Sequence, residues 1–166
     1  PEGQDIRPTS DKVRLALFNA LYSRRAVVDA VVLDAFCGTG ALGLEALSQG
    51  AKTAQFFDIS KTSLGLAKDN AKVLGLLDRA HFSQKDASQL GARPENILPA
   101  SLVFLDPPYH KNLLEPTLAG LKAGMWLAHE AWIVIESEKE WHCPAGFGVC
   151  DFEKTYGITK IQMIRV

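Results

Sequence analysis

The sequence has little cysteine, and this scarcity excludes several kinds of site. Its 166 residues include three cysteines, at positions 37, 143 and 150, whereas disulfide-rich and zinc-binding folds need paired cysteines at short spacings. His142 beside Cys143 is too sparse a donor set to hold a metal. We therefore expect reduced thiols, a cytoplasmic location and no bound metal.

Long apolar runs and an excess of charge are missing as well. No stretch reaches the roughly 18 apolar residues that a membrane span needs, and no charged and then apolar leader opens the chain. The 18 Lys and Arg residues against 19 Asp and Glu residues leave a formal charge of -1. We therefore expect a soluble protein with no membrane partner, in which any nucleic-acid surface is a local patch.

Hydrophobic residues, by contrast, are plentiful, at 47% of the chain. This composition supports the core of one domain, while 166 residues are short for two ordinary ones. No internal repeat or low-complexity tract is visible in the sequence. We predict a single domain over residues 1–166 and expect a monomer.

Short runs rich in β-branched and aromatic residues alternate with helical periodicity along most of the chain. The spacing of Val13, Leu17 and Leu21 predicts a leading amphipathic helix at about residues 8–22. The alternation that follows predicts a parallel sheet with helices on both faces, and the residues around Tyr156-Gly157 predict a closing antiparallel hairpin. The predicted strands are 31–36, 53–57, 80–84, 101–105, 132–136, 149–154 and 158–165, and the predicted helices are 41–49, 60–74 and 113–121, the first two ended by Gly50 and Gly75.

A glycine-rich turn follows the first predicted strand. Gly38, Gly40 and Gly43 satisfy the G-x-G-x-x-G spacing, which brings a nucleotide-like cofactor close to bare backbone. Asp34 ends the strand before the turn, and Asp58 ends the next strand, where a carboxylate can accept both hydroxyls of a ribose. A dinucleotide-dependent oxidoreductase has the same turn, so the glycines alone leave that class open.

The tetrapeptide Asp106-Pro107-Pro108-Tyr109 directly follows the apolar run 101–105 and indicates a site for an amine. The exocyclic amine of a nucleobase is a poor nucleophile because its lone pair is delocalised into the ring. The Asp106 carboxylate and the Pro107 carbonyl can accept its N–H groups, and two prolines keep the turn rigid and free of donors. Tyr109 offers a flat face for a flipped base. An ordinary strand-ending turn with Tyr109 in the core is the alternative.

Taken together, these segments resemble the class I S-adenosylmethionine-dependent methyltransferases, and within them the RsmD type, which methylates the N2 amine of a guanine in 16S ribosomal RNA of the small subunit. The resemblance covers nearly the whole chain. It implies a Rossmann-like, seven-stranded, mostly parallel sheet and an RNA substrate in an assembled or assembling small subunit. The segments that carry it are Arg7-Pro8-Thr9, residues 34–45, residues 106–109, Ile135-Glu136-Ser137-Glu138 and Tyr156-Gly157.

The resemblance also implies roles for single residues. It assigns the catalytic grip on the guanine to Asp106, Pro107, Pro108 and Tyr109, with Asp106 also in the cofactor site. The S-adenosylmethionine-binding residues that it implies are Asp34, Phe36, Gly38 and Gly40 around the methionine part, Asp58 and Ile59 at the ribose, Asp86 and Ala87 at the adenine, and Thr9 at the carboxylate end. In the family the ribose acid is usually a glutamate with a second acid two residues later, whereas this chain has Asp58 and Ser60.

Three rival functions remain open on the residues alone. An N6-adenine methyltransferase of DNA or RNA would use the same tetrapeptide, since it too must hold an exocyclic amine. A non-catalytic assembly factor would bind cofactor or RNA without transfer, and an oxidoreductase would bind NAD at the glycine turn. The three tryptophans, at positions 126, 132 and 141, are predicted to lie in the core.

Overall fold

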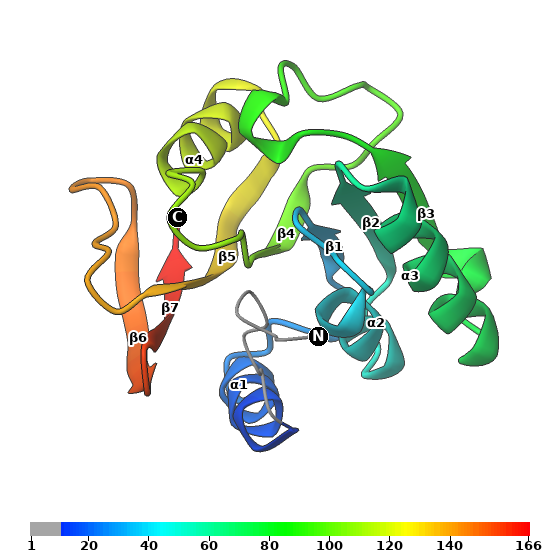
Figure 1. Ribbon diagram of the computed structural model, residues 1–166, viewed down its shortest axis with the longest axis horizontal. Coiled ribbons are helices and arrows are strands. Elements are labelled where there is room, and N and C mark those ends of the chain that lie inside the picture. The colour runs from blue at the N-terminus through cyan, green and yellow to red at the C-terminus, as the bar shows by residue number, and fades with distance from the viewer. Residues whose placement is uncertain (1–10) are drawn as a thin grey trace.

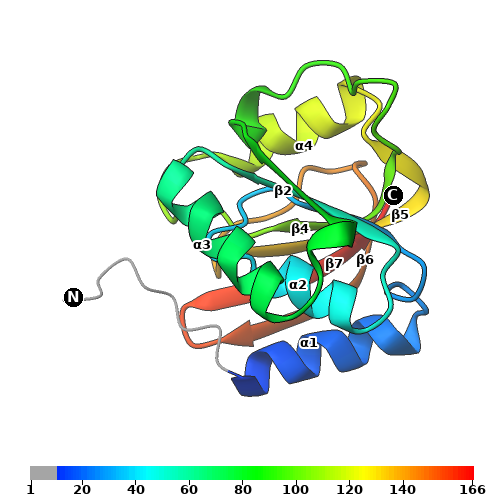
Figure 2. The same cartoon turned by 90° about the vertical axis from the view of Figure 1, so that its right-hand side faces the viewer.

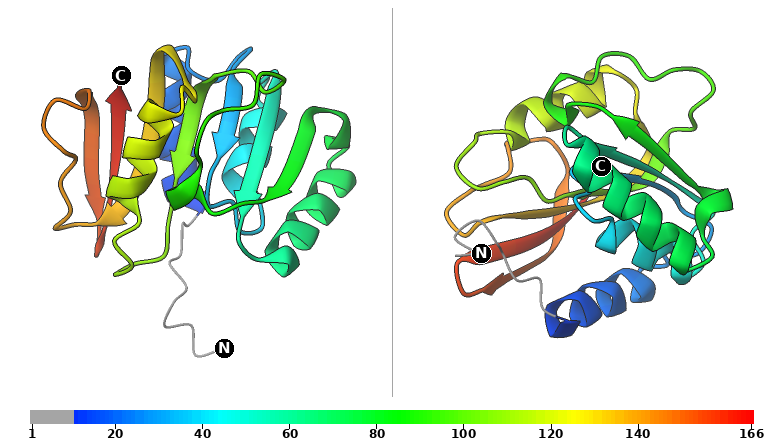
Figure 3. Two further views of the ribbon diagram at one scale, coloured as in Figure 1. Left: turned by 90° about the horizontal axis from the view of Figure 1, so that it is seen from above. Right: turned by 45° about the vertical axis from the view of Figure 1, so that its right-hand side comes forward.

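A twisted β-sheet forms the centre of the computed structural model, which describes residues 11–166 (Figure 1). Thr9 and the start of the predicted leading helix lie outside the described residues. Seven strands within this range form one sheet in the order β3-β2-β1-β4-β5-β7-β6, and Figure 3 shows them side by side. The strands are β1 (Val31–Asp34), β2 (Thr53–Asp58), β3 (Ala80–Gln84), β4 (Ala100–Leu105), β5 (Leu127–Glu138), β6 (Val149–Tyr156) and β7 (Thr159–Arg165).

The first five strands are parallel, and the end of the chain closes the sheet as an antiparallel hairpin. β7 pairs antiparallel with both β5 and β6. Its two-residue turn is Gly157-Ile158, where Gly157 has a φ of 62°, a conformation that glycine adopts without steric cost. The predicted fold class, a Rossmann-like sheet with a C-terminal hairpin, is confirmed.

Helices cover both faces of the sheet (Figure 2). α1 (Asp11–Ser23), α2 (Ala41–Ser48) and α3 (Lys61–Val73) pack on one face, and α4 (Leu114–Ala123) packs on the other. Two single 3-10 turns, η1 (Leu77–Arg79) and η2 (Ala87–Gln89), flank β3. None of the helices within residues 11–166 combines the length and apolar character that crossing a bilayer requires.

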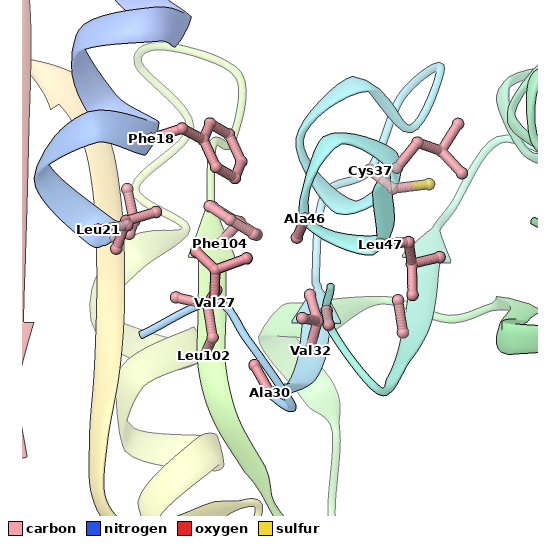
Figure 4. Close-up of a cluster of buried hydrophobic side chains, with 14 of the residues drawn as sticks. Phe18, Leu21, Val27, Ala30, Val32, Cys37, Ala46, Leu47, Leu102 and Phe104 are labelled. Atoms are coloured by element: carbon pink, nitrogen blue, oxygen red, sulfur yellow. The ribbon is translucent and has the colours of Figure 1, made fainter. Parts of the chain in front are cut away.

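Two hydrophobic cores lie on the two faces of the sheet, and successive side chains of β4 point alternately into one and the other. Leu102 and Phe104 face the side of α1 and α2, where Phe104 packs against Phe18 with ring centroids 5.9 Å apart (Figure 4). Val103 and Leu105 face α4. β4 is therefore buried on both faces, which explains why its sequence is a continuous apolar run.

Several predicted boundaries shift in the structure. β1 ends at Asp34 and not at residue 36, because the chain turns away after the Ala35 N–H donates to the Phe104 carbonyl. β5 begins at Leu127, five residues before its predicted start, and β6 continues to Tyr156. Gly50 and Gly75 end α2 and α3 as predicted, with φ values of 108° and 73°.

The strand order places a ligand-binding edge at the carboxyl end of β1. β1 pairs with β2 on one side and with β4 on the other. From β1 the chain continues outward to β2 and β3, and it then returns to the other side of β1 to form β4 and β5. In open α/β sheets, ligands bind outside the carboxyl ends of the strands at such a switch point. The glycine-rich turn and the Asp106 tetrapeptide both lie at this edge.

Candidate functional site

Three carboxyl groups gather at the carboxyl edge of the sheet. Asp34 ends β1, Asp58 ends β2, and Asp106 directly follows β4. β1 is the neighbour of both other strands, so Asp34 lies between the other two acids. This edge therefore carries an excess of negative charge that a cationic ligand would relieve.

Asp34 is the most deeply placed of the three acids. Only 2% of the residue is exposed, and its Oδ2 accepts a hydrogen bond of 2.9 Å from the Gly43 N–H. Burial raises the pKa of Asp34 from 3.8 to about 7; the Gly43 bond opposes this rise, and the charges of Asp106 and Asp58 add to it. Asp34 therefore titrates near neutral pH, and a nearby positive charge would favour its ionised form.

The glycine turn presents bare backbone to the same edge. Gly38 and Gly40 have φ values of 54° and 85°, which other residues rarely adopt. A Cβ atom built on Gly38 would meet no atom within 4 Å, so open space lies beside that backbone. At Gly43 the requirement is packing, because a Cβ there would lie 2.8 Å from Cζ of Phe56. The turn therefore has room for a ligand at its first glycine and none at its third.

Asp58 ties the turn to the end of β2. Its Oδ2 accepts the Gly38 N–H at 2.8 Å, and its Oδ1 accepts the Ser60 N–H at 2.9 Å. A carboxylate offers about four lone-pair sites, so two remain for ligand hydroxyls. The adjacent Ile59 is 69% exposed, an apolar surface beside the acid. Ser60 lies two residues after Asp58, and its hydroxyl caps α3 by accepting the Ser63 N–H at 3.1 Å.

The remaining predicted cofactor residues differ in their placement. Asp86 is exposed and caps η2, where its Oδ1 accepts the Ser88 N–H at 2.9 Å. Ala87 is buried beneath it, and Phe36 is half-buried against the core on the α4 side. The structure thus brings Asp34, Gly38, Asp58 and Ile59 to one edge, while Asp86 and Phe36 also serve local folding.

The tetrapeptide loop is anchored to two other strands. Pro107 is buried, whereas Asp106 and Tyr109 are half-buried. The Tyr109 hydroxyl hydrogen-bonds to Oγ1 of Thr159 at the start of β7. The His110 N–H donates to Glu138 Oε2 at 2.8 Å, at the end of β5. His110 and Asn112 have φ values of 62° and 53°, a strained backbone of the kind that clusters at functional sites.

A narrow pocket opens beside this loop. It has a volume of about 60 Å³, and Pro108, Tyr109 and Trp141 contribute to its walls. Three carboxylates, those of Glu115, Glu136 and Glu138, also line it, and no lysine or arginine of residues 11–166 does. The pocket is therefore suited to a ligand that donates hydrogen bonds and unsuited to a phosphate.

Trp141 is the pocket residue for which the predicted core position holds only in part, since it packs against the core on the α4 side but is not fully buried. Trp126 and Trp132 are buried as predicted, but Trp141 is half-buried on the loop after β5. Its Nε1 donates to Glu115 Oε2 at 3.1 Å, which joins that loop to the start of α4. The signal was present in the sequence before Trp141, since the charged run Glu138-Lys139-Glu140 is typical of a surface segment.

The described part of the chain offers no cluster of metal ligands. No group of three His, Cys, Asp or Glu side chains within residues 11–166 is arranged to hold an ion. The chemistry of the edge is instead that of hydrogen-bond acceptors around an open backbone turn, next to a pocket with an aromatic wall. Such an arrangement can hold a cationic cofactor and orient an amine against it.

Comparison with known proteins gives consistent matches over this fold. Residues 1–165 match the family model described as Conserved hypothetical protein 95. The Ribosomal RNA small subunit methyltransferase D of Escherichia coli (strain K12) is 38% identical over 140 residues, which are 84% of this chain and 68% of that protein. Its namesake in Haemophilus influenzae is 36% identical over 138 residues, 82% and 70% of the two chains. A solved putative methyltransferase, yhhF from Escherichia coli, superposes with a TM-score of 0.83 at 36% identity and covers 98% and 88% of the chains.

Proposed function

The chain belongs to the Conserved hypothetical protein 95 family, and we propose that it transfers a methyl group from S-adenosylmethionine to the N2 amine of a guanine in small-subunit ribosomal RNA. The RsmD-type resemblance seen in the sequence is confirmed by the family match and by the curated relatives. Those relatives are named as methyltransferases of small-subunit ribosomal RNA. The choice of guanine N2 and the roles of single residues are our proposal.

One observation carries the proposal most directly. Asp106 and the glycine turn lie on adjacent parallel strands at the same carboxyl edge, with β1 next to β4. A donor held at the turn and an acceptor amine held by the tetrapeptide would therefore face each other across one short gap. Positioning of this kind supplies much of the rate in a transfer whose donor is already activated.

The residues of the edge fit S-adenosylmethionine. The open space beside Gly38 admits the cofactor against bare backbone, and the spare lone pairs of Asp58 suit two ribose hydroxyls. The exposed Ile59 offers an apolar surface to an adenine. The cofactor supplies a methyl group on a positively charged sulfur, and the acidic edge around Asp34 complements that charge.

The tetrapeptide would then make the amine a better nucleophile. The Asp106 carboxylate and the Pro107 carbonyl accept its N–H groups and draw the lone pair back onto nitrogen. Tyr109, held by Thr159, offers its ring to the base, an interaction worth about 1 to 3 kcal/mol. After transfer the amine loses a proton to Asp106 or to water.

The acidic lining of the pocket supports guanine over adenine. The Watson–Crick edge of guanine presents two adjacent donors, N1–H and the N2 amine, which carboxylates accept side by side. The edge of adenine presents its N6 amine beside N1, an acceptor that a carboxylate repels. A site rich in carboxylates, as this one is, therefore matches guanine better than adenine.

We further propose that the substrate is the RNA within an assembled or assembling small subunit in the cytoplasm. The formal charge of -1 provides little general attraction for RNA. A preformed ribosomal surface would supply the missing affinity. Methyl transfer should then be faster on isolated small subunits than on the naked transcript, and equal rates would contradict this part of the proposal.

The test of catalysis separates binding from transfer. Asp106→Ala and Asp106→Asn should lower methyl transfer to unmodified small subunits by about 100-fold or more, while calorimetry should find the affinity for S-adenosylhomocysteine within a few-fold of the wild type. Wild-type protein that binds this product but methylates no RNA would indicate an assembly factor. Preferential binding of NAD would contradict the assignment altogether.

A further inference from the structure

The narrow pocket beside the tetrapeptide loop, here named the acceptor pocket, cannot itself hold the backbone of an RNA substrate. Its lining carries the carboxylates of Glu115, Glu136 and Glu138, which repel phosphates. If the proposed function holds, one nucleotide enters this pocket while its flanking phosphates lie outside. The cations that hold those phosphates must therefore lie around the pocket and not inside it.

Three lysines frame this region from three different segments. Lys111 follows His110, whose N–H is bound by Glu138 at 2.8 Å. Lys139 directly follows Glu138, and its own N–H donates to the Ile158 carbonyl at 3.1 Å. Lys154 lies on β6 two residues before the end of that strand. These two hydrogen bonds thus connect the tetrapeptide loop, the end of β5 and the tip of the β6–β7 hairpin.

The side chains of these lysines are available to a ligand. Lys111, Lys139 and Lys154 are all exposed, and none forms an ion pair with another residue of the range 11–166. The opposite end of the hairpin differs. There Arg165 pairs with Glu130 at 2.9 Å, and Arg24 pairs with Asp151 at 2.7 Å. Cationic charge without an acidic partner is therefore found at the end of the hairpin that lies next to the pocket.

Apolar and aromatic surface accompanies the lysines. Lys154 Nζ lies 5.3 Å from the ring centroid of Tyr156, which is half-buried. Ile158, in the hairpin turn, is 67% exposed. Exposed lysines beside a partly open aromatic ring suit a single-stranded nucleic acid, because the lysines bind phosphates while the ring receives a base.

We propose that Lys111, Lys139 and Lys154 form a surface, the lysine rim, that binds the phosphates flanking the target nucleotide. Figure 1 shows the β6–β7 hairpin beside the end of β5. The rim contacts backbone and not bases, so it contributes affinity and orientation without sequence preference. It rests on the proposed function but concerns a surface outside the methyl-transfer site.

The test compares two triple variants of equal charge. K111A/K139A/K154A removes the rim, and K52A/K68A/K72A removes three exposed lysines from α3 and the segment before β2. Binding of a protein-free small-subunit RNA transcript is measured by fluorescence anisotropy at KCl concentrations from about 50 to about 200 mM. Methyl transfer to isolated small subunits gives kcat and KM, and calorimetry gives the affinity for S-adenosylhomocysteine.

The rim variant should bind the transcript on the order of tenfold more weakly, and the slope of log affinity against log salt should fall by roughly 2. Its KM should rise while kcat and the affinity for S-adenosylhomocysteine stay within about twofold, since the rim acts on RNA binding and not on the transferred group. The control variant should match the wild type. Equal losses of affinity for the transcript in both variants, or no loss in either, would contradict the proposal that the lysine rim binds RNA. Wild-type protein that binds the transcript through the rim without methylating any RNA would overturn only the proposed function.

Discussion

The carboxylate of Asp58 at the end of β2 holds the backbone N–H of Gly38 at 2.8 Å, and so joins the second strand to the glycine turn that follows the first. The same carboxylate accepts the Ser60 N–H at 2.9 Å. One side chain therefore orders both the turn and the start of α3. In the proposed complex this acid binds the ribose from a position that the fold has already fixed.

Removal of the Asp58 carboxylate should consequently affect stability and binding together. Asp58→Ala leaves two backbone donors without their acceptor, which should cost about 1 to 3 kcal/mol in the free energy of unfolding. The affinity for S-adenosylhomocysteine should fall at least about tenfold. Asp78→Ala is the control, since Asp78 is an exposed acid in η1 and is not among the predicted cofactor residues. Denaturant unfolding and calorimetry give both quantities, and unchanged affinity in Asp58→Ala would remove that residue from the cofactor site.

Asp34 should make the protein less stable as the pH rises. Burial raises the pKa of this carboxyl from its ordinary value of 3.8 to about 7 in the folded protein, so the folded state binds more protons than the unfolded chain between these values. Stability therefore falls from about pH 4 to pH 7 through this group. Asp34→Asn should raise the free energy of unfolding above pH 7 by on the order of 4 kcal/mol, and the gain should vanish below about pH 4. A gain that does not depend on pH would contradict the role of Asp34 ionisation.

Gly43 should tolerate no side chain. In Gly43→Ala the new Cβ would lie 2.8 Å from Cζ of the buried Phe56, so α2 must move away from the sheet. We expect a loss of about 2 to 4 kcal/mol in the free energy of unfolding, as for other overpacked cores. Gly65→Ala in α3 is the control, because a Cβ there meets nothing within 4 Å and should stabilise the helix by up to about 1 kcal/mol. Similar free energies of unfolding for the two variants would show that the contact with Phe56 does not exclude a side chain at Gly43.

The bond between Tyr109 and Thr159 should couple the tetrapeptide loop to β7. Tyr109→Phe and Thr159→Val each remove one partner, and the two together should cost little more than either alone. Each should lower kcat/KM for methyl transfer by roughly 3- to 10-fold, corresponding to about 1 kcal/mol of lost positioning. Tyr109→Ala should lose at least about tenfold more, because the ring is gone as well. Additive effects of Tyr109→Phe and Thr159→Val would mean that the two hydroxyls act separately.

Much of the fold could be predicted from local sequence patterns. The apolar run of β4, the glycines that end α2 and α3, and the acids at strand ends all lie where periodicity and turn chemistry place them, because each depends on near neighbours. The start of β5 could not be predicted in the same way. Residues 127–131 contain no β-branched or aromatic side chain, and Glu130 has a φ of 57°, so pairing with β4 decides that they form a strand.

For a similar reason, the acceptor pocket could not be predicted from local sequence patterns. Trp141 and Glu115 are 26 residues apart, and they meet only because α4 packs beside the end of β5. The bonds of the tetrapeptide loop to Glu138 and Thr159 likewise join segments that only the sheet order brings together. Sequence patterns predicted that acids and glycines follow the strands at this edge, whereas the walls of the pocket depend on tertiary packing.

The identity of the methylated base tests the central claim most directly. Small ribosomal subunits that lack the modification are incubated with the protein and labelled S-adenosylmethionine, and the RNA is then digested to nucleosides and separated. We predict that the label is found in N2-methylguanosine, and that Asp106→Ala forms this product at least about 100-fold more slowly. Label in N6-methyladenosine, or in DNA in place of RNA, would contradict the account.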